Sequence, residues 1–196
     1  MFEEDKLEII NFNAILSDMF SEHPKILGWY SCCTQETRFD ILKGIGDWSH
    51  KTVLDVGCGY ADLFKHIQRD TNYTGVDIDP ARIQIAKQRY PDANVFVLDI
   101  LDETIDSQFD YVVASGIFSS PTAHHTEWMW ATIDKMFKLC KIGVAFNFIS
   151  IHAKHKLDDY IYRDPDEILS YCKSISNNVV IKQEYLNNDA TIYMHK

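Results

Sequence analysis

The sequence predicts an α/β fold with a mostly parallel sheet and an antiparallel strand at its C-terminal edge. Short apolar runs of strand length alternate with segments of helical periodicity along most of the chain. Such alternation is typical of parallel βαβ units with right-handed crossovers. The last two apolar runs, residues 179–186 and 190–195, are separated only by polar residues 187–189. So short a link favours an antiparallel pair at the end of the sheet.

Two helices are expected before the first strand. Leu7, Ile10 and Ala14 recur at helical spacing, which predicts a helix over residues 4–20. A second helix is predicted over residues 35–46. A chain of 196 residues is typical of one domain. We therefore expect a single domain that comprises an N-terminal helical cap and a core, over residues 1–48 and 49–196.

The core is predicted as strands that alternate with helices. The expected parallel strands cover residues 53–56, 73–77, 95–98, 111–114 and 142–149. The expected helices lie at residues 63–67, after Asp79-Pro80, from His124-His125 through Cys140, and after Asp164-Pro165. In each Asp-Pro pair the aspartate suits the N-cap and the proline suits the first helical position.

Composition restricts the partners and the location that we expect. The formal net charge is −10, which disfavours a long nucleic acid because phosphate binding requires a Lys/Arg surface. No apolar run approaches the ~18–20 residues that cross a bilayer, and the acidic N-terminus does not resemble a signal peptide. The five cysteines include no C-x-x-C pair. We therefore expect thiols rather than disulfides or a zinc site, in a reducing cytoplasm.

The strongest local signal is the segment Asp55-Val56-Gly57-Cys58-Gly59, which follows a predicted strand and opens a helix. Open α/β sheets bind ligands at this edge, beyond the carboxyl ends of their strands. Glycines there allow the backbone to approach a ligand closely. The alternative is a tight turn without a ligand, because a glycine-rich turn alone is weak support for a binding site.

Two further carboxylates stand at the ends of the next strands. Asp77 follows Gly57 by 20 residues, the spacing at which an acidic residue accepts hydrogen bonds from a ribose diol. Asp99 ends the third strand, where a carboxylate could accept from an adenine amino group. Each residue also has a simpler interpretation: Asp77 as a solvated carboxylate at a strand end, and Asp99 as a turn residue.

The pattern favours a nucleoside ligand without phosphate groups. In a dinucleotide fingerprint the third glycine stands five positions after the first. Here that position is Asp62, whose charge opposes a pyrophosphate at the helix N-terminus. The sequence also lacks the Gly-Lys-Ser/Thr of a P-loop. S-adenosylmethionine fits better, because its ammonium and sulfonium suit a site edged by Asp55, Asp62 and Asp77.

Four segments together resemble the motifs of class I S-adenosylmethionine-dependent methyltransferases. They are residues 53–59, which resemble motif I, and residues 73–79, 97–100 and 109–115. The resemblance implies a Rossmann-like, doubly wound sheet of seven strands with a terminal antiparallel hairpin. The cofactor-binding residues that it implies are Asp55, Gly57, Cys58, Gly59, Asp77, Ile78, Asp99, Ile100 and Ser115.

The resemblance also implies individual roles. Asp55 and the two glycines would surround the methionyl end of the cofactor, and Asp77 would hold the ribose. Asp99 and the Ile100 backbone would flank the adenine, and Ser115 would lie near the methionyl group and the reaction centre. The chain departs from the family pattern at two places, Ala61 instead of a third glycine and Lys141-Ile142-Gly143 instead of a Pro-Gly-Gly turn.

The N-terminal residues Gly28-Trp29-Tyr30, Gln35, Arg38 and Phe39 are similar to those of a bacterial subgroup of small methyltransferases. In related enzymes an N-terminal helix covers the cofactor. Arg38 would then pair with the methionyl carboxylate through its guanidinium fork. The alternative is an arginine on the surface of a helix.

Methyl transfer from a sulfonium is an in-line displacement, so the enzyme mainly has to align the acceptor with the methyl group. A base is needed only if the acceptor must lose a proton. The candidates for that role are His124, His125, His152, His155 and Tyr160. The alternative for the first two is a pair of exposed polar residues at a helix start. No metal is assigned.

The absence of two motifs narrows the class of methyl acceptor that we expect. No Asp/Asn-Pro-Pro-Tyr tetrapeptide follows the fourth strand, and no Pro-Cys dipeptide occurs. Methylation of exocyclic amines of bases or glutamine, and of cytosine C5 in DNA, is therefore disfavoured. We expect a small molecule with an oxygen or nitrogen target. The alternatives are a tRNA or protein methyltransferase, and an S-adenosylmethionine-binding interaction or regulatory protein without turnover.

Overall fold

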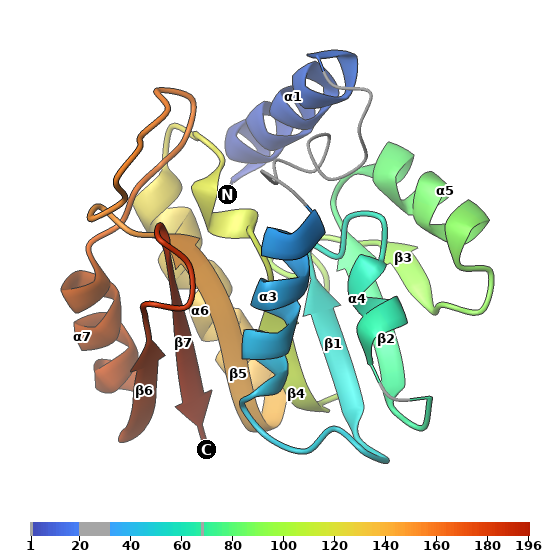
Figure 1. Cartoon of the computed structure of the whole chain (residues 1–196). Coiled ribbons are helices and arrows are strands. Elements are labelled where there is room, and N and C mark those ends of the chain that lie inside the picture. The colour runs from blue at the N-terminus through green and yellow to red at the C-terminus, as the bar shows by residue number, and fades with distance from the viewer. Residues whose placement is uncertain (1, 20–31, 68) are drawn as a thin grey trace.

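A computed structural model describes residues 2–19, 32–67 and 69–196, and shows a seven-stranded sheet with helices on both faces (Figure 1). The strands are β1 (Thr52–Val56), β2 (Asn72–Asp77), β3 (Val95–Val97), β4 (Phe109–Ala114), β5 (Cys140–Ile149), β6 (Asn178–Lys182) and β7 (Asp189–His195). Their order in the sheet is β3-β2-β1-β4-β5-β7-β6. Neighbours from β3 to β5 pair in parallel, whereas β7 is antiparallel to both β5 and β6. The predicted α/β class and the terminal antiparallel pair are confirmed, with β7 lying one place in from the edge.

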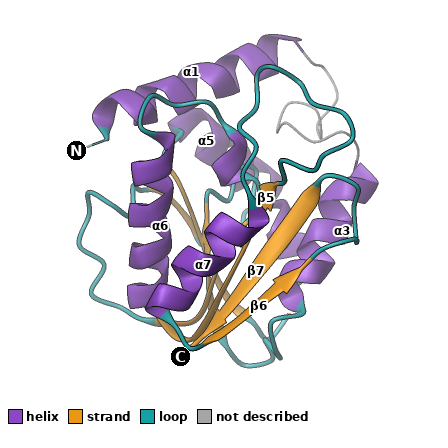
Figure 2. Cartoon of the chain, turned by 90° about the vertical axis from the view of Figure 1, so that its left-hand side faces the viewer, coloured by secondary structure: helices purple, strands orange, loops and turns teal. Residues whose placement is uncertain are grey.

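Helices cover the sheet in two layers and cross one of its ends. They are α1 (Glu3–Met19), α3 (Cys32–Lys43), α4 (Asp62–His66), α5 (Pro80–Arg89), α6 (His125–Leu139) and α7 (Pro165–Ile175). Helices α3, α4 and α5 lie on one face, and α6 and α7 lie on the other (Figures 1 and 2). Helix α1 lies across the end of the sheet to which the parallel strands point (Figure 1). The motif Gly28-Trp29-Tyr30 falls outside the described residues.

Each face of the sheet packs against its own apolar core. Leu42 of α3, Leu63 of α4 and Ile83 of α5 are buried on one face. Met129 and Ile133 of α6 lie in the core on the other face. A fully buried side chain of this size contributes about 1.5–3 kcal/mol through removal of apolar surface from water. These contacts fix the sheet as a rigid base for the residues at its carboxyl edge.

Local sequence signals set two helix starts correctly. The Asp79 carboxylate accepts a hydrogen bond from the backbone N–H of Ala81 at 2.9 Å, and α5 begins at Pro80. The Asp164 carboxylate accepts from the N–H of Asp166 at 2.9 Å, and α7 begins at the next proline. Both predicted N-caps are confirmed.

Several predicted boundaries were wrong. The helix expected over residues 35–46 is α3, Cys32–Lys43. Cys140 was expected to end a helix, but it begins β5 with extended backbone angles. Strand β6 was expected to continue to residue 186, but it ends at Lys182. Glu184 has a φ of 66°, a left-handed conformation that cannot continue a strand.

The chain order places a ligand-binding edge between β1 and β4. From β1 the chain moves outward through β2 and β3, and it then returns to the other side of β1 as β4. Open α/β sheets bind ligands outside the carboxyl ends of the strands at such a reversal. Among the described residues, no helix is long and apolar enough to cross a membrane.

Candidate active site

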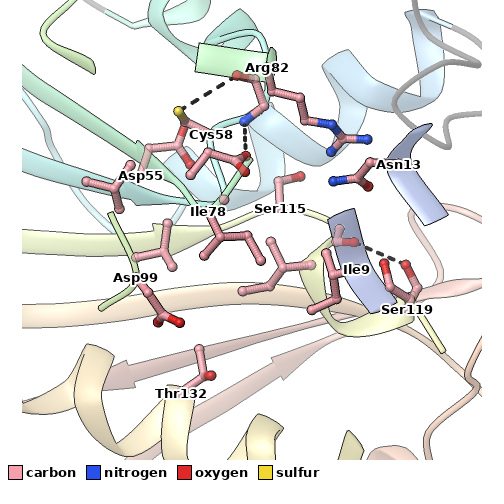
Figure 3. Close-up of a pocket in the computed structure, with 18 of the residues that line it drawn as sticks. Ile9, Asn13, Asp55, Cys58, Ile78, Arg82, Asp99, Ser115, Ser119 and Thr132 are labelled. Carbon is pink, nitrogen blue, oxygen red and sulfur yellow. Dashed lines mark hydrogen bonds between the residues drawn. The ribbon is translucent and has the colours of Figure 1, made fainter. Parts of the chain in front are cut away.

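A cavity lies at the carboxyl edge of the sheet, between the strand ends and α1 (Figure 3). Nine of the ten predicted ligand residues line it, and the tenth, Arg38, does not. The nine are Asp55, Gly57, Cys58, Gly59, Asp77, Ile78, Asp99, Ile100 and Ser115. Helix α1 contributes further lining residues, among them Ile9, Phe12 and Leu16. The fold thus brings the separate sequence motifs to one concave site.

The glycine turn after β1 adopts a backbone conformation in which residues other than glycine would be strained. Gly57 and Gly59 have φ angles of 70° and 55°, in the left-handed region that favours glycine. The N–H groups of Gly57 and Cys58 both donate to the Val76 carbonyl, at 2.8 and 3.0 Å. A Cβ added to Gly57 would lie 2.2 Å from Ile117 Cγ2. The turn is therefore held tightly against β2 and leaves no space for a side chain.

Asp77 is a buried carboxylate at the centre of this arrangement. Its Oδ2 accepts from the N–H of Gly59 at 2.8 Å, and its Oδ1 accepts from the N–H of Asp79 at 2.9 Å. Burial raises the pKa of Asp77, an effect that the nearby Arg82 guanidinium opposes. The side chain is only 5% exposed, so the interpretation as a solvated strand-end carboxylate was wrong. Each oxygen keeps lone-pair capacity for a ligand hydroxyl.

Asp55 is a second buried carboxylate in the cavity wall. The Tyr73 hydroxyl donates to its Oδ2 at 2.8 Å. Burial raises the pKa of Asp55 to about 7, and Asp77 and Asp62 add to this effect while the Tyr73 hydrogen bond opposes it. A cation bound beside Asp55 would favour the ionised form.

Asp99 serves as a turn residue and also lines the cavity. Its Oδ1 accepts from the N–H of Leu101 at 2.9 Å, in the turn that follows β3. Its Oδ2 lies 3.6 Å from the ammonium of Lys6 on α1. The two interpretations of Asp99 are therefore compatible, because one oxygen stabilises the turn and the other faces a cation of the cavity lining.

Several lining residues that carry charge or hydrogen-bonding groups were not predicted from the sequence. Lys6 and Asn13 come from α1, and the Asn13 amide donates to Asp79 at 3.3 Å. Arg82 lies in the first turns of α5, with its Nε 3.8 Å from the same aspartate. Its position three residues after Asp79, at helical spacing, is a signal that could have found it. No local pattern marks Lys6 or Asn13, because their neighbours here are remote in the chain.

Two predicted site residues have other partners. The Arg38 guanidinium forms an ion pair with the buried Asp189 of β7 at 2.6 Å, so it is neither in the cavity lining nor a surface arginine. Asp62, expected to edge the site, does not line the cavity. Its carboxylate accepts from the Gln35 amide at 3.3 Å and from the Tyr90 hydroxyl at 3.2 Å. Both corrections arise because a buried charge requires partners, which Asp189 provides for Arg38 and which Gln35 and Tyr90 provide for Asp62.

Of the candidate catalytic residues, the structure brings Tyr160 to the cavity. Its ring packs edge-on against Phe12 at a centroid distance of 5.8 Å. Burial raises the pKa of the phenol, so it is protonated near neutral pH. In that state it can orient an acceptor by hydrogen bonding, but it is a weak base.

The histidine candidates lie outside the cavity lining. His125 Nε2 is 3.0 Å from the Phe118 carbonyl, and burial lowers the pKa of this imidazole. His124 lies beside Asp5 of α1, which accepts from the His124 backbone N–H at 2.7 Å. His152 and His155 follow β5 and do not line the cavity either. The histidines that were predicted at the cavity mouth are thus placed away from its walls.

Comparison with known proteins indicates a methyltransferase. Residues 54–146 match a methyltransferase domain family. The chain is 31% identical over 155 residues to a Mycobacterium tuberculosis protein named "Putative methyltransferase Rv1506c", covering 74% of this chain and 93% of that one. The fold matches magnesium protoporphyrin IX methyltransferase (ChlM) from Synechocystis PCC 6803 with bound SAH, at a TM-score of 0.71 and 12% identity, over 100% of this chain and 98% of that one. It also matches the DhpI–SAH complex, at a TM-score of 0.71 and 15% identity, over 97% and 96% of the two chains.

The sheet order and the motif-lined cavity define a Rossmann-like methyltransferase fold. The chain belongs to the class I S-adenosylmethionine-dependent methyltransferases. It is accordingly an enzyme of methyl transfer.

Proposed function

We propose that this enzyme transfers a methyl group from S-adenosylmethionine to an oxygen or nitrogen atom of a small molecule by in-line displacement. One observation carries the proposal: residues from four separate motifs line a single cavity at the point where the strand order reverses. The proposal treats residues 1–196 as one domain, in which the N-terminal segment of residues 1–48 supplies part of the cavity wall. Lys6 and Phe12 of α1 and Phe39 of α3 support that division.

The lining residues fit the cofactor. Asp77 would accept hydrogen bonds from the ribose, and Asp99 with Ile100 would flank the adenine. Asp55 would face the cationic methionyl end, beside a glycine turn in which a Cβ has no space. When bound, the cofactor supplies the reactive methyl group on its sulfonium. The protein has to hold the acceptor in line with that group and exclude competing nucleophiles.

The small-molecule acceptor is supported by the other walls of the cavity. Phe12 and Leu16 of α1 lie there with Ser119, Ser120 and Tyr160. These residues combine apolar surface with a few hydroxyl groups, which is typical of small-molecule sites. Tyr160 is held beside Ser119 because the neighbouring Ile161 N–H donates to the Ser119 carbonyl at 2.9 Å. The structurally similar ChlM is named for a porphyrin substrate, which is also a small molecule.

Two measurements test the proposed function. Isothermal titration with S-adenosylhomocysteine should give one binding site per chain. Labelled S-adenosylmethionine, supplied with a panel of small hydroxylated and amine metabolites, should then yield a labelled metabolite. Labelling confined to bulk RNA or protein would overturn the small-molecule acceptor, and absence of nucleoside binding would overturn the cofactor site.

We expect cofactor affinity to increase with pH around neutrality. Asp55 has a pKa raised to about 7, and a cationic ligand favours its ionised form, so binding below that pH must release a proton. S-adenosylmethionine should therefore bind about tenfold more weakly at about pH 6 than at about pH 8. Titration calorimetry in buffers of different ionisation enthalpy would measure both the affinity and the proton release.

Two variants check the origin of that pH dependence. Asp55→Asn should flatten it, because the titrating group is removed. Tyr73→Phe should move the midpoint to higher pH, because the Tyr73 hydrogen bond lowers the pKa of Asp55. An unchanged profile in Asp55→Asn would assign the proton to another group.

A further inference from the structure

Asn147 is a buried amide within an otherwise apolar part of β5. It is 3% exposed, and it makes two hydrogen bonds to the segment that follows β4. Its side-chain oxygen accepts from the N–H of Gly116 at 2.7 Å, and its side-chain nitrogen donates to Ser115 Oγ at 3.2 Å. Asn147 therefore holds two consecutive residues, Ser115 and Gly116, directly after β4. Ser115 lines the cavity (Figure 3).

The orientation of this amide follows from chemistry. A backbone N–H can only donate, so the atom that faces Gly116 must be the Asn147 oxygen. The amide NH2 group is then left facing Ser115, and it too can only donate. Ser115 Oγ must accept this hydrogen bond. The hydrogen of the Ser115 hydroxyl is consequently left to be donated to another group.

The position of Ser115 indicates where that donor acts. Val56 pairs with Ala114 in the sheet, so the next residues, Gly57 and Ser115, leave the two strands side by side. The N–H groups of the glycine turn are already used within the protein, by the Val76 carbonyl and the Asp77 carboxylate. Arg38, the residue expected to bind the methionyl carboxylate, is paired with Asp189 instead. The Ser115 hydroxyl thus offers a donor beside the glycine turn.

Only one group at the amino-acid end of the cofactor can accept such a bond strongly. The ammonium group donates, and the sulfonium carries positive charge. The carboxylate is an acceptor and forms the stronger, charge-assisted type of hydrogen bond.

We propose that Asn147 is a positioning residue that directs the Ser115 hydroxyl to donate to the carboxylate of the bound cofactor. This inference rests on the proposed function, since it requires that the cavity binds S-adenosylmethionine. It adds a residue outside the four sequence motifs to the cofactor site. Asn147 acts through Ser115 and does not itself touch the ligand.

Two substitutions separate the direction of the hydroxyl from its presence. Asn147→Asp keeps the shape of the side chain but replaces the NH2 group by an oxygen, so that Ser115 must donate to the new carboxylate and withdraw its hydrogen from the ligand. Ser115→Ala removes the hydroxyl and leaves the bond between Asn147 and Gly116. Ser115→Thr retains a hydroxyl and should rescue binding. The control is Asn94→Asp, which makes the same charge change at an exposed amide that donates to Thr74 Oγ1 at 3.2 Å.

Three ligands without a transferable methyl group serve as probes in titration calorimetry. S-adenosylhomocysteine carries the ammonium and the carboxylate, its decarboxylated analogue carries only the ammonium, and 5′-methylthioadenosine carries neither. Ser115→Ala and Asn147→Asp should each lower the affinity for S-adenosylhomocysteine by about tenfold or more. The two ligands without a carboxylate should bind these variants no more weakly than the wild type. Asn94→Asp should leave the affinities for all three ligands unchanged.

The outcomes distinguish the inference from the function on which it rests. Failure of S-adenosylhomocysteine to bind the wild-type enzyme would overturn the proposed function. If S-adenosylhomocysteine binds the wild type, but Ser115→Ala loses affinity equally for all three ligands, the inference would be overturned while the proposed cofactor site would stand. If Asn147→Asp does not fold, as thermal melting would reveal, the comparison of Ser115→Ala with Ser115→Thr across the three ligands still decides the question.

Discussion

Replacing Asp77 by asparagine is expected to weaken S-adenosylhomocysteine binding by at least about 100-fold, because two charge-assisted hydrogen bonds to the ribose diol would be lost. Both carboxylate oxygens already accept backbone N–H groups, from Gly59 and from Asp79. An asparagine would direct its NH2 group at one of these donors. The substitution therefore removes the charge and also disturbs either the glycine turn or the start of α5. Titration calorimetry measures the loss directly.

The matched control for this substitution is Asp92→Asn. Asp92 is an exposed residue between α5 and β3, so the charge change is the same while the cavity is untouched. Its affinity for S-adenosylhomocysteine should equal that of the wild type. Asp77→Ala provides a second variant without the opposing NH2 group. Wild-type affinity in Asp77→Ala would show that Asp77 does not hold the ribose.

Replacing Gly57 by alanine should reduce both stability and cofactor binding. The residue has a φ of 70°, and its new Cβ would lie 2.2 Å from Ile117 Cγ2. The left-handed backbone and the steric overlap together should lower the free energy of unfolding by about 2–4 kcal/mol. Ile117 also lines the cavity, so its displacement should lower the affinity for S-adenosylhomocysteine by about 100-fold. Thermal melting and calorimetry measure the two effects.

A double variant separates the two causes. Ile117→Ala removes the atom that the new Cβ would meet, so Gly57→Ala should cost less stability in that background than in the wild type. The remaining loss would report the strained φ angle. Equal losses in both backgrounds would contradict the steric part of this argument, and wild-type binding by Gly57→Ala alone would contradict the close approach of the ligand to this turn.

The features that could be predicted from the sequence depend on neighbouring residues. Asp79 and Asp164 cap helices because each accepts from a backbone N–H two residues ahead. The order of apolar runs determined the parallel strands, and a parallel sheet aligns the carboxyl ends of its strands at one edge. Asp55, Asp77 and Asp99 therefore had to reach the same edge once the strand order was set. The sequence by itself thus determined the fold class and most of the cofactor-binding edge.

The remaining features were decided by tertiary packing. Arg38 pairs with Asp189, far away in the chain, because a buried guanidinium requires a carboxylate and β7 provides one. Lys6 reaches Asp99 because α1 lies across the end of the sheet. Asn147 faces Ser115 because β5 pairs with β4 in a particular register. Such contacts depend on where whole elements dock, and local sequence patterns carry no information about that geometry.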